Sequence, residues 1–156
     1  MALDATIGGA SSNSFCTVAE ADDYLADRFD VNGWDNYGTR EKEEVLIAAA
    51  DILDYLEWDG TPETTTQALQ WPRIDTVDRF GNALTGVPDV VKNAQAALAF
   101  ALITQEYVDA DIAFSHINID GVIMDASGKR GLPSKVTRLI KHLYTDRSYV
   151  AKVHRT

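Results

Sequence analysis

The sequence predicts a mainly α-helical protein: a compact bundle of about four helices with a small β-hairpin and an extended C-terminal arm. Four stretches place apolar residues at helical spacing, and one later stretch alternates apolar and polar residues. The 156 residues, 46% of them hydrophobic, are enough for one domain with a buried core. We place that domain at residues 1–145, beginning with an irregular arm at 1–16, and the C-terminal arm at 146–156.

Two helices are expected in the first third of the chain. Thr17 and Glu20 form a capping-box pair, which predicts a helix over 17–29. An apolar face predicts the next helix over 39–56, and charged residues such as Lys42 are expected to lie off that face. The face consists of Leu46, Ala49, Ala50, Leu53 and Leu56.

Prolines mark the element boundaries in the middle of the chain. Residues 61–69 predict a turn and a short helix, which Pro72 would stop because proline cannot continue a helix. Pro88 suits the first position of a helix, so a third long helix is expected over 88–108. The many alanines of this third helix permit close packing against another helix.

The last third of the chain changes its period. Alternating residues with a turn at Asp120-Gly121 predict a β-hairpin within 114–125. A final helix is expected over 134–144. The tail then reads DRSYVAKVHRT, and its alternating side chains are typical of a strand that pairs with the edge of a partner's sheet.

Charge is divided unevenly along the chain. Residues 1–112 hold 21 Asp/Glu and 6 Lys/Arg, whereas residues 113–156 hold 3 Asp/Glu and 8 Lys/Arg. One interpretation is a solvated surface of uneven charge; the other is a basic end that meets an acidic partner, a copy of the chain or DNA phosphates. The residues that we expect to contact a partner are Lys135, Arg138, Lys141, Arg147, Tyr149, Lys152, Val153 and Arg155.

No residue pattern predicts catalysis, a cofactor or a metal site. The sequence has no glycine-rich phosphate loop and no hydrolase or metalloprotease motif. His116, His142 and His154 lack the spacing of metal ligands. The single Cys16 has no nucleophile signature around it, so we expect an inert thiol and a protein that is not an enzyme. No apolar run is long enough for a membrane span, and we expect no membrane partner.

Aromatic residues offer a separate hypothesis, because aromatic rings can stack on the bases of single-stranded nucleic acid. The candidates are Trp34, Tyr37, Trp58, Trp71 and Phe80. Stacking residues normally lie in a positive groove, whereas every tryptophan here lies in the acidic part of the chain. This favours aromatic residues that pack as core or lid residues.

Several motifs occur in a familiar order. NSFCTVAEADDYLADR comes first, LIAAADILDYL follows, and QALQWPR precedes VPDVVKNAQAALA. Over about residues 13–105 this order resembles a family of tailed-phage proteins that are often described as DnaT-like, and that are similar to head–tail connector (adaptor, head-completion) proteins.

The resemblance implies a structural virion protein without catalytic activity. It implies a ring, typically dodecameric, that joins portal to tail and lines the DNA channel. The implied partners are other copies of the chain, the portal protein, a tail or tail-completion protein and passing double-stranded DNA. The implied location is the neck of the virion, and the host cytoplasm during assembly. The DnaT-like label implies an alternative, a replication protein that binds single-stranded DNA, and the acidic surroundings of the tryptophans argue against it.

The WPR motif is expected to fix a loop. Trp71 can bury a large apolar area, Pro72 ends the short helix, and Arg73 can pair with acidic residues nearby. Pro88 sets the start of the third helix. The loop tip at 80–82 is then a candidate contact with a neighbouring protein.

Overall fold

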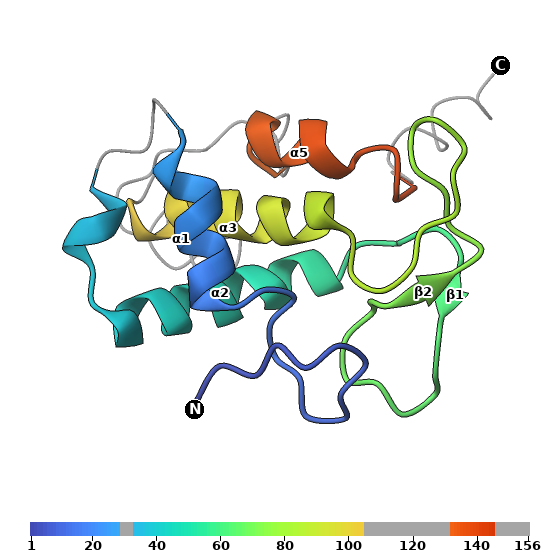
Figure 1. The fold of residues 1–156 in the computed structure, drawn as a ribbon, viewed down its shortest axis with the longest axis horizontal. Helices are drawn as coiled ribbons and strands as arrows, with labels where there is room; N and C mark the ends of the chain where they lie inside the picture. The colour runs from blue at the N-terminus through green and yellow to red at the C-terminus, as the bar shows by residue number, and fades with distance from the viewer. Residues whose placement is uncertain (29–32, 105–131, 146–156) are drawn as a thin grey trace, which may run out of the picture.

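A computed structural model describes residues 1–28, 33–104 and 132–145 of this chain. In that part of the chain the fold is mainly α-helical, as the sequence predicts. The helices are α1 (Val18–Ala26), α2 (Thr39–Asp54), α3 (Asp89–Ile103) and α5 (Ser134–Ile140), and a 3-10 turn covers Trp34–Asn36. Figure 1 shows α3 between α2 and α5, with α1 lying across them. No helix among the described residues is long and apolar enough to cross a membrane.

The four long helices that were predicted are present, but their ends differ by a few residues. Thr17 and Glu20 form the expected capping box, with Glu20 N donating to Thr17 Oγ1 and Thr17 N donating to Glu20 Oε2. Pro88 is the N-cap and not the first helical residue, because its ψ of 147° is extended. α2 ends at Asp54, before the predicted Leu56.

Lys42 does not lie off the apolar face of α2, and that prediction was wrong. Its side chain is only 8% exposed at the residue level, and its ammonium lies 2.9 Å from Asp22 Oδ1. The same oxygen accepts a 2.7 Å hydrogen bond from Trp34 Nε1. The apolar stem of lysine can be buried when its charged end finds such a partner, and here the pair joins α1 to α2.

The predicted short helix within 61–69 is absent. Gln67 satisfies the backbone locally instead: its Oε1 accepts from Thr64 N at 3.0 Å, and its Nε2 donates to the carbonyls of Leu69 and Pro72. Such local side-chain bonds compete with helix formation. The chain forms strand β1 (Thr61–Pro62) here.

A small antiparallel hairpin is present, at a place that the sequence analysis did not predict. β1 pairs with β2 (Arg73–Ile74) in the register Thr61↔Ile74 and Pro62↔Arg73. The hairpin predicted within 114–125 and the C-terminal arm at 146–156 lie outside the described residues.

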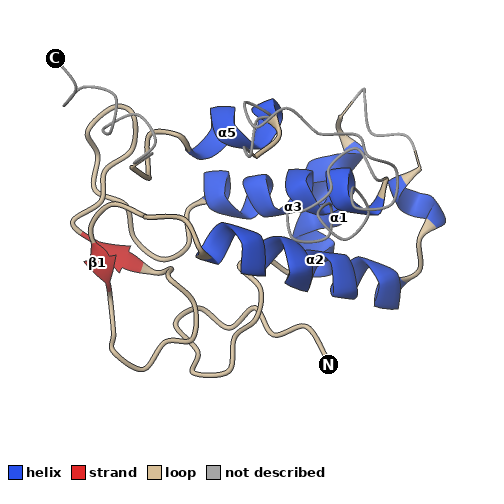
Figure 2. Ribbon diagram, turned by 180° about the vertical axis from the view of Figure 1, so that it is seen from behind, coloured by secondary structure: helices blue, strands red, loops and turns tan. Residues whose placement is uncertain are grey.

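Helix α3 lies at the centre of the core. Nine of its fifteen residues are buried, so it is covered around most of its circumference by α1, α2 and α5. Figures 1 and 2 show this arrangement from opposite sides. Five of the buried residues are alanines, whose small side chains let the neighbouring helices approach closely.

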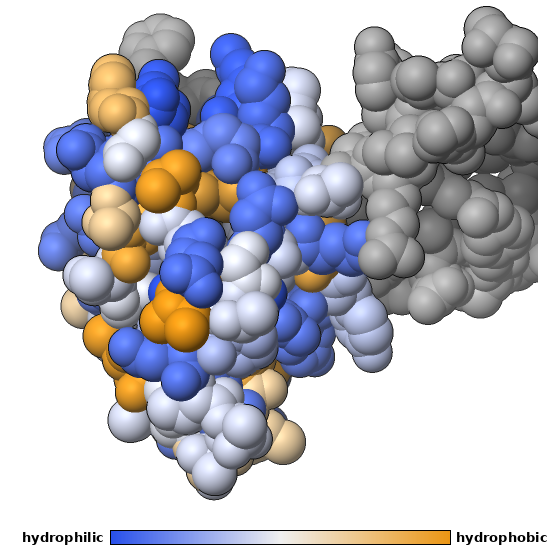
Figure 3. Space-filling view, turned by 90° about the vertical axis from the view of Figure 1, so that its right-hand side faces the viewer, coloured by the Kyte–Doolittle hydropathy of each residue, from blue (hydrophilic) through white to orange (hydrophobic). Residues whose placement is uncertain are grey.

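The two-stranded hairpin lies at one end of the molecule. We call this the hairpin end, and it comprises residues 57–62, 70–86 and 143–145. Asp59 N donates to Leu143 O and Thr145 N donates to Glu57 O, each at 2.9 Å. The segment that follows α5 is therefore bound to the segment that precedes β1. Figure 3 looks onto this end.

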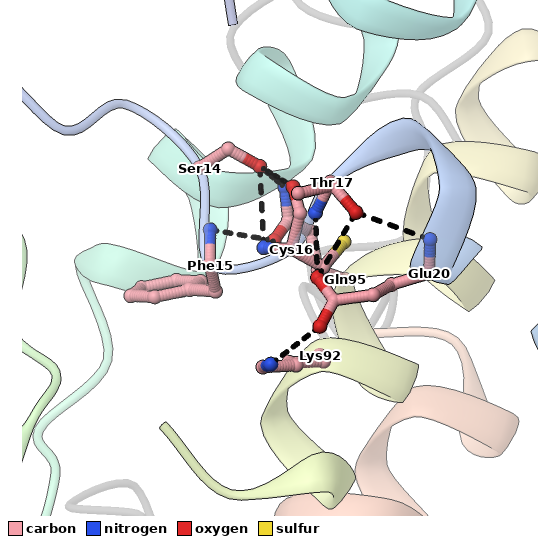
Figure 4. Close-up of polar contacts among 7 residues, drawn as sticks. All are labelled: Ser14, Phe15, Cys16, Thr17, Glu20, Lys92 and Gln95. Atoms are coloured by element: carbon pink, nitrogen blue, oxygen red, sulfur yellow. Dashed lines mark hydrogen bonds and ion pairs between the residues drawn. The ribbon is translucent and has the colours of Figure 1, made fainter. Parts of the chain in front are cut away.

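The amide of Gln95, a fully buried residue of α3, holds the N-terminal arm against the core (Figure 4). Its Oε1 accepts from Phe15 N at 2.9 Å and from Cys16 N at 3.1 Å. Its Nε2 donates to Ser14 Oγ at 2.7 Å and to Leu46 O at 2.8 Å. All four hydrogen-bonding positions of the amide are thus used.

The same arrangement encloses the Cys16 thiol, which is 0% exposed. Burial, with a further contribution from the Glu20 carboxylate, raises the pKa of Cys16 to about 12. A thiol is nucleophilic as its thiolate. In the folded protein the Cys16 thiol is protonated at neutral pH and out of reach of reagents in solvent, so it is unreactive.

We expect Gln95→Ala to lower the free energy of unfolding by about 2–4 kcal/mol, because it leaves buried partners unpaired and opens a cavity. The measurement is urea denaturation. Asn93→Ala, at a half-buried position on the same helix, is the matched control and should cost much less. Equal losses in the two variants would contradict the assigned role of the amide.

We expect Cys16 to resist maleimide at pH 8 in the folded protein and to react with one equivalent in urea. The pKa also has a consequence for stability. Above the ordinary thiol range the unfolded chain loses its proton while the folded chain keeps it, so stability falls as pH rises toward about 12. The Cys16→Ala variant should lack this part of the loss of stability at alkaline pH. Rapid maleimide labelling of the native protein would contradict a buried, protonated thiol.

Candidate functional site

Arg73 is the centre of the hairpin end, and it is 6% exposed. Its Nε donates to Asp59 O, its Nη1 to the carbonyl and side-chain oxygens of Gln70, and its Nη2 to the carbonyls of Trp58 and Gly60, at 2.7–3.2 Å. The expected pairing with acidic side chains is replaced by these carbonyl contacts. Burial lowers the pKa of Arg73, and the nearby carboxylates act in the opposite direction. The guanidinium therefore holds a loop together and has no donor left for a ligand.

The other residues of the WPR motif also lie inside the protein. Trp71 is 2% exposed and packs edge-on against Trp58, with ring centroids 5.5 Å apart. The bond from Trp71 to the buried Pro72 is cis, and Pro72 O accepts from Glu63 N at 3.0 Å. Gly60 must be glycine, because its φ is +71° and a Cβ would lie 2.1 Å from Ile74 O.

Burial separates the aromatic residues into two groups. The tryptophans are 2–6% exposed, which confirms their prediction as core residues and removes them as stacking candidates. Phe80 is 81% exposed and Tyr55 is 90% exposed. Tyr55 was missed in the sequence, although its place just after the apolar face of α2 was a usable signal. Tyr37 is partly buried, and its hydroxyl lies 3.4 Å from Ile103 O.

Tyr55 borders a hollow of about 580 Å³ at the hairpin end. Burial raises the pKa of the Asp54 carboxyl in this hollow. The 2.6 Å hydrogen bond that Gln70 N donates to Asp54 Oδ1 lowers the pKa but does not cancel the effect of burial. The acidic side chains here would repel a phosphate. The lining residues are Asp54, Tyr55, Leu56, Glu57, Trp58, Gln70, Arg73 and Thr145.

Helix α5 and its C-cap, Lys141, carry the Lys and Arg residues that the structure describes from the C-terminal third. Arg138 and Lys141 are exposed and Lys135 is half-buried, opposite the face that packs on α3. Residues 132–145 contain no Asp or Glu. The other predicted contact residues, Arg147, Tyr149, Lys152, Val153 and Arg155, lie outside the described residues.

A second hollow, of about 370 Å³, is acidic and lies between α1 and the start of α3. Four carboxylates line it, which makes it unsuitable for an anion. Its residues are Glu20, Asp23, Tyr24, Asp27, Arg28, Asp89, Lys92 and Asn93. Within residues 1–28, 33–104 and 132–145, no group of His, Cys, Asp and Glu is arranged to hold a metal ion.

Comparison with known proteins gives one match. Over residues 1–156 the chain matches the family described as "Putative DnaT-like ssDNA binding protein". No curated protein and no solved structure matches it significantly.

This match corrects the function that the sequence analysis favoured. The assignment as a head–tail connector was wrong, and so were the partners that depended on it: the ring of copies, the portal, the tail protein and double-stranded DNA in the channel. The family description names single-stranded DNA, which was the alternative. The expected location of the protein is tested by no observation and stays a prediction. Because the match covers the whole chain, the protein belongs to the DnaT-like family.

Proposed function

We propose that this protein binds single-stranded DNA, and that it acts by binding without catalysis. The observation that carries the proposal is the family match over residues 1–156. Binding of single strands combines basic residues that follow the phosphates with aromatic rings that stack on bases. The described surface offers both kinds of residue.

Helix α5 is the phosphate-binding element in this proposal. Lys135, Arg138 and Lys141 follow one another at intervals of three residues, so they lie along one side of the helix. Val136 and Ile140, both 0% exposed, fix the other side of the helix in the core. The cations are therefore presented from a rigid base, in a segment without carboxylates.

The acidic remainder of the protein restricts where DNA can lie. The net charge is −10, and the hollows beside Tyr55 and beside α1 are both lined by carboxylates. Coulomb repulsion between these carboxylates and phosphates disfavours most of the surface. If a DNA strand binds along α5, its phosphates lie away from both acidic hollows. One of its bases could still lie near the exposed Tyr55.

We expect replacement of Lys135, Arg138 and Lys141 by glutamine to weaken binding to a fluorescein-labelled oligothymidine by at least about tenfold at physiological salt. Each lost phosphate contact also removes about 0.7 from the slope of log K against log salt for a single strand, so the slope should fall by about 2. Fluorescence anisotropy over about 50 to 200 mM salt measures both effects.

A matched pair of single variants provides the control. Arg138→Gln removes one exposed charge from α5, whereas Arg40→Gln removes one exposed charge from α2, where Arg40 pairs with Glu44 at 3.0 Å. Only the first should weaken binding and reduce the slope. If the wild-type protein does not bind oligothymidine at physiological salt, the proposed function is wrong.

A further inference from the structure

Phe80 stands in water at the tip of the loop formed by residues 75–84, although burial of an aromatic ring is among the largest apolar gains in folding. We propose that this loop holds Phe80 as a base-stacking residue, so that a nucleobase of single-stranded DNA lies on its ring. The inference rests on the proposed DNA binding and assigns a residue to it.

The loop is held by five local hydrogen bonds that involve Asp78. Its Oδ1 accepts from Phe80 N at 2.8 Å and from Asn82 N at 2.9 Å, and its Oδ2 accepts from Asn82 Nδ2 at 3.1 Å. Asp78 N donates to Asn82 O, and Gly81 N donates to Asp78 O. A carboxylate that caps a turn in this way fixes the backbone on both sides of Phe80.

The base of the loop is closed as well. Val77 and Ala83 form an antiparallel bridge, and Leu84 N donates to Thr76 O at 3.0 Å. Gly81, with a φ of +86°, supplies the left-handed residue that the turn requires. Because the backbone of the loop is already ordered, the loop would lose little conformational entropy when a base stacks on Phe80.

A cation accompanies the ring. The Arg79 guanidinium lies 5.8 Å from the centroid of the Phe80 ring, and both side chains are exposed. A ring that takes a base needs a nearby positive group for the attached phosphate, and Arg79 is placed to be that group.

The surroundings of Phe80 favour a base over the apolar surface of another protein. Figure 3 shows the apolar residues at this end as separate orange areas among hydrophilic ones. A protein interface has a continuous, well-packed apolar centre. Ile74 and Val77 in the same segment are also exposed, at 46% and 51%, but Phe80 alone of the three offers an aromatic ring beside a cation, the combination on which single-strand-binding proteins stack bases.

Hydrogen bonds also connect the segment after α5 to the segment that leads into the Phe80 loop. The segment 143–145, directly after α5, is bonded to residues 57–59, and Arg73 bonds those residues to the start of the loop. Figures 1 and 2 both show the loop and the C-terminal end of α5 at the hairpin end. A strand whose phosphates follow α5 therefore arrives at this end.

The test uses two oligonucleotides of equal length, an oligothymidine and an abasic strand that has the same phosphates without bases. The variants are Phe80→Ala, Phe80→Leu and Phe80→Tyr. We expect Phe80→Ala and Phe80→Leu to weaken binding of oligothymidine by about 5- to 100-fold, and Phe80→Tyr to bind like the wild type. On the abasic strand, all four proteins should bind equally and weakly. Since Phe80 is exposed, urea denaturation should show unchanged stability in every variant.

Leucine separates stacking from general apolar contact, because it keeps apolar area and lacks a π face. If Phe80→Leu binds oligothymidine as the wild type does, or if Phe80→Ala loses nothing, the inference is overturned while DNA binding stands. If Phe80→Ala and Phe80→Leu instead change the oligomeric state in size-exclusion chromatography with light scattering, the loop is a contact between copies and the inference is again overturned. A wild-type protein that binds neither strand refutes DNA binding itself.

Discussion

The hydrogen bonds of Gln95 determine how the first part of the chain meets the rest. One buried amide joins the arm at Phe15 and Cys16 to α3, and also reaches the carbonyl of Leu46 on α2. α1 begins immediately after this contact, so its direction follows from it. An amide in an apolar core is unfavourable unless every polar position is paired. The need to pair every polar atom of this amide therefore selects one arrangement of the N-terminal arm, α2 and α3.

Much of the fold could be predicted from the sequence, because periodic apolar residues identify helices whatever their neighbours are. The ends of those helices could not, since tertiary contacts set them. Lys42 shows the same limit: its sequence neighbours predict exposure, and only a partner on another helix, Asp22, explains its burial. A short helix was predicted within 61–69, yet the hydrogen bonds of Gln67 to residues on both sides of it fix a different path.

The candidate site was harder to predict, because net charge is an average and binding is local. The acidic surroundings of the tryptophans argued correctly that these residues do not stack, but the argument did not extend to α5, whose segment lacks carboxylates. Exposure is also a tertiary property. The sequence placed Phe80 at a loop tip and Trp71 in the core, but only the structure gives the exposure of Phe80 and of Tyr55, 81% and 90%.

The close contact between α5 and α3 has a consequence for synthesis on the ribosome. α3 ends at Ile103, but α5, which packs against it, begins only at Ser134. The bond from Thr145 N to Glu57 O can form only after residue 145 has left the exit tunnel. Until α5 has been synthesised, the side of the alanine-rich α3 that α5 packs on lacks this partner, and transiently exposed apolar surface of this kind favours aggregation.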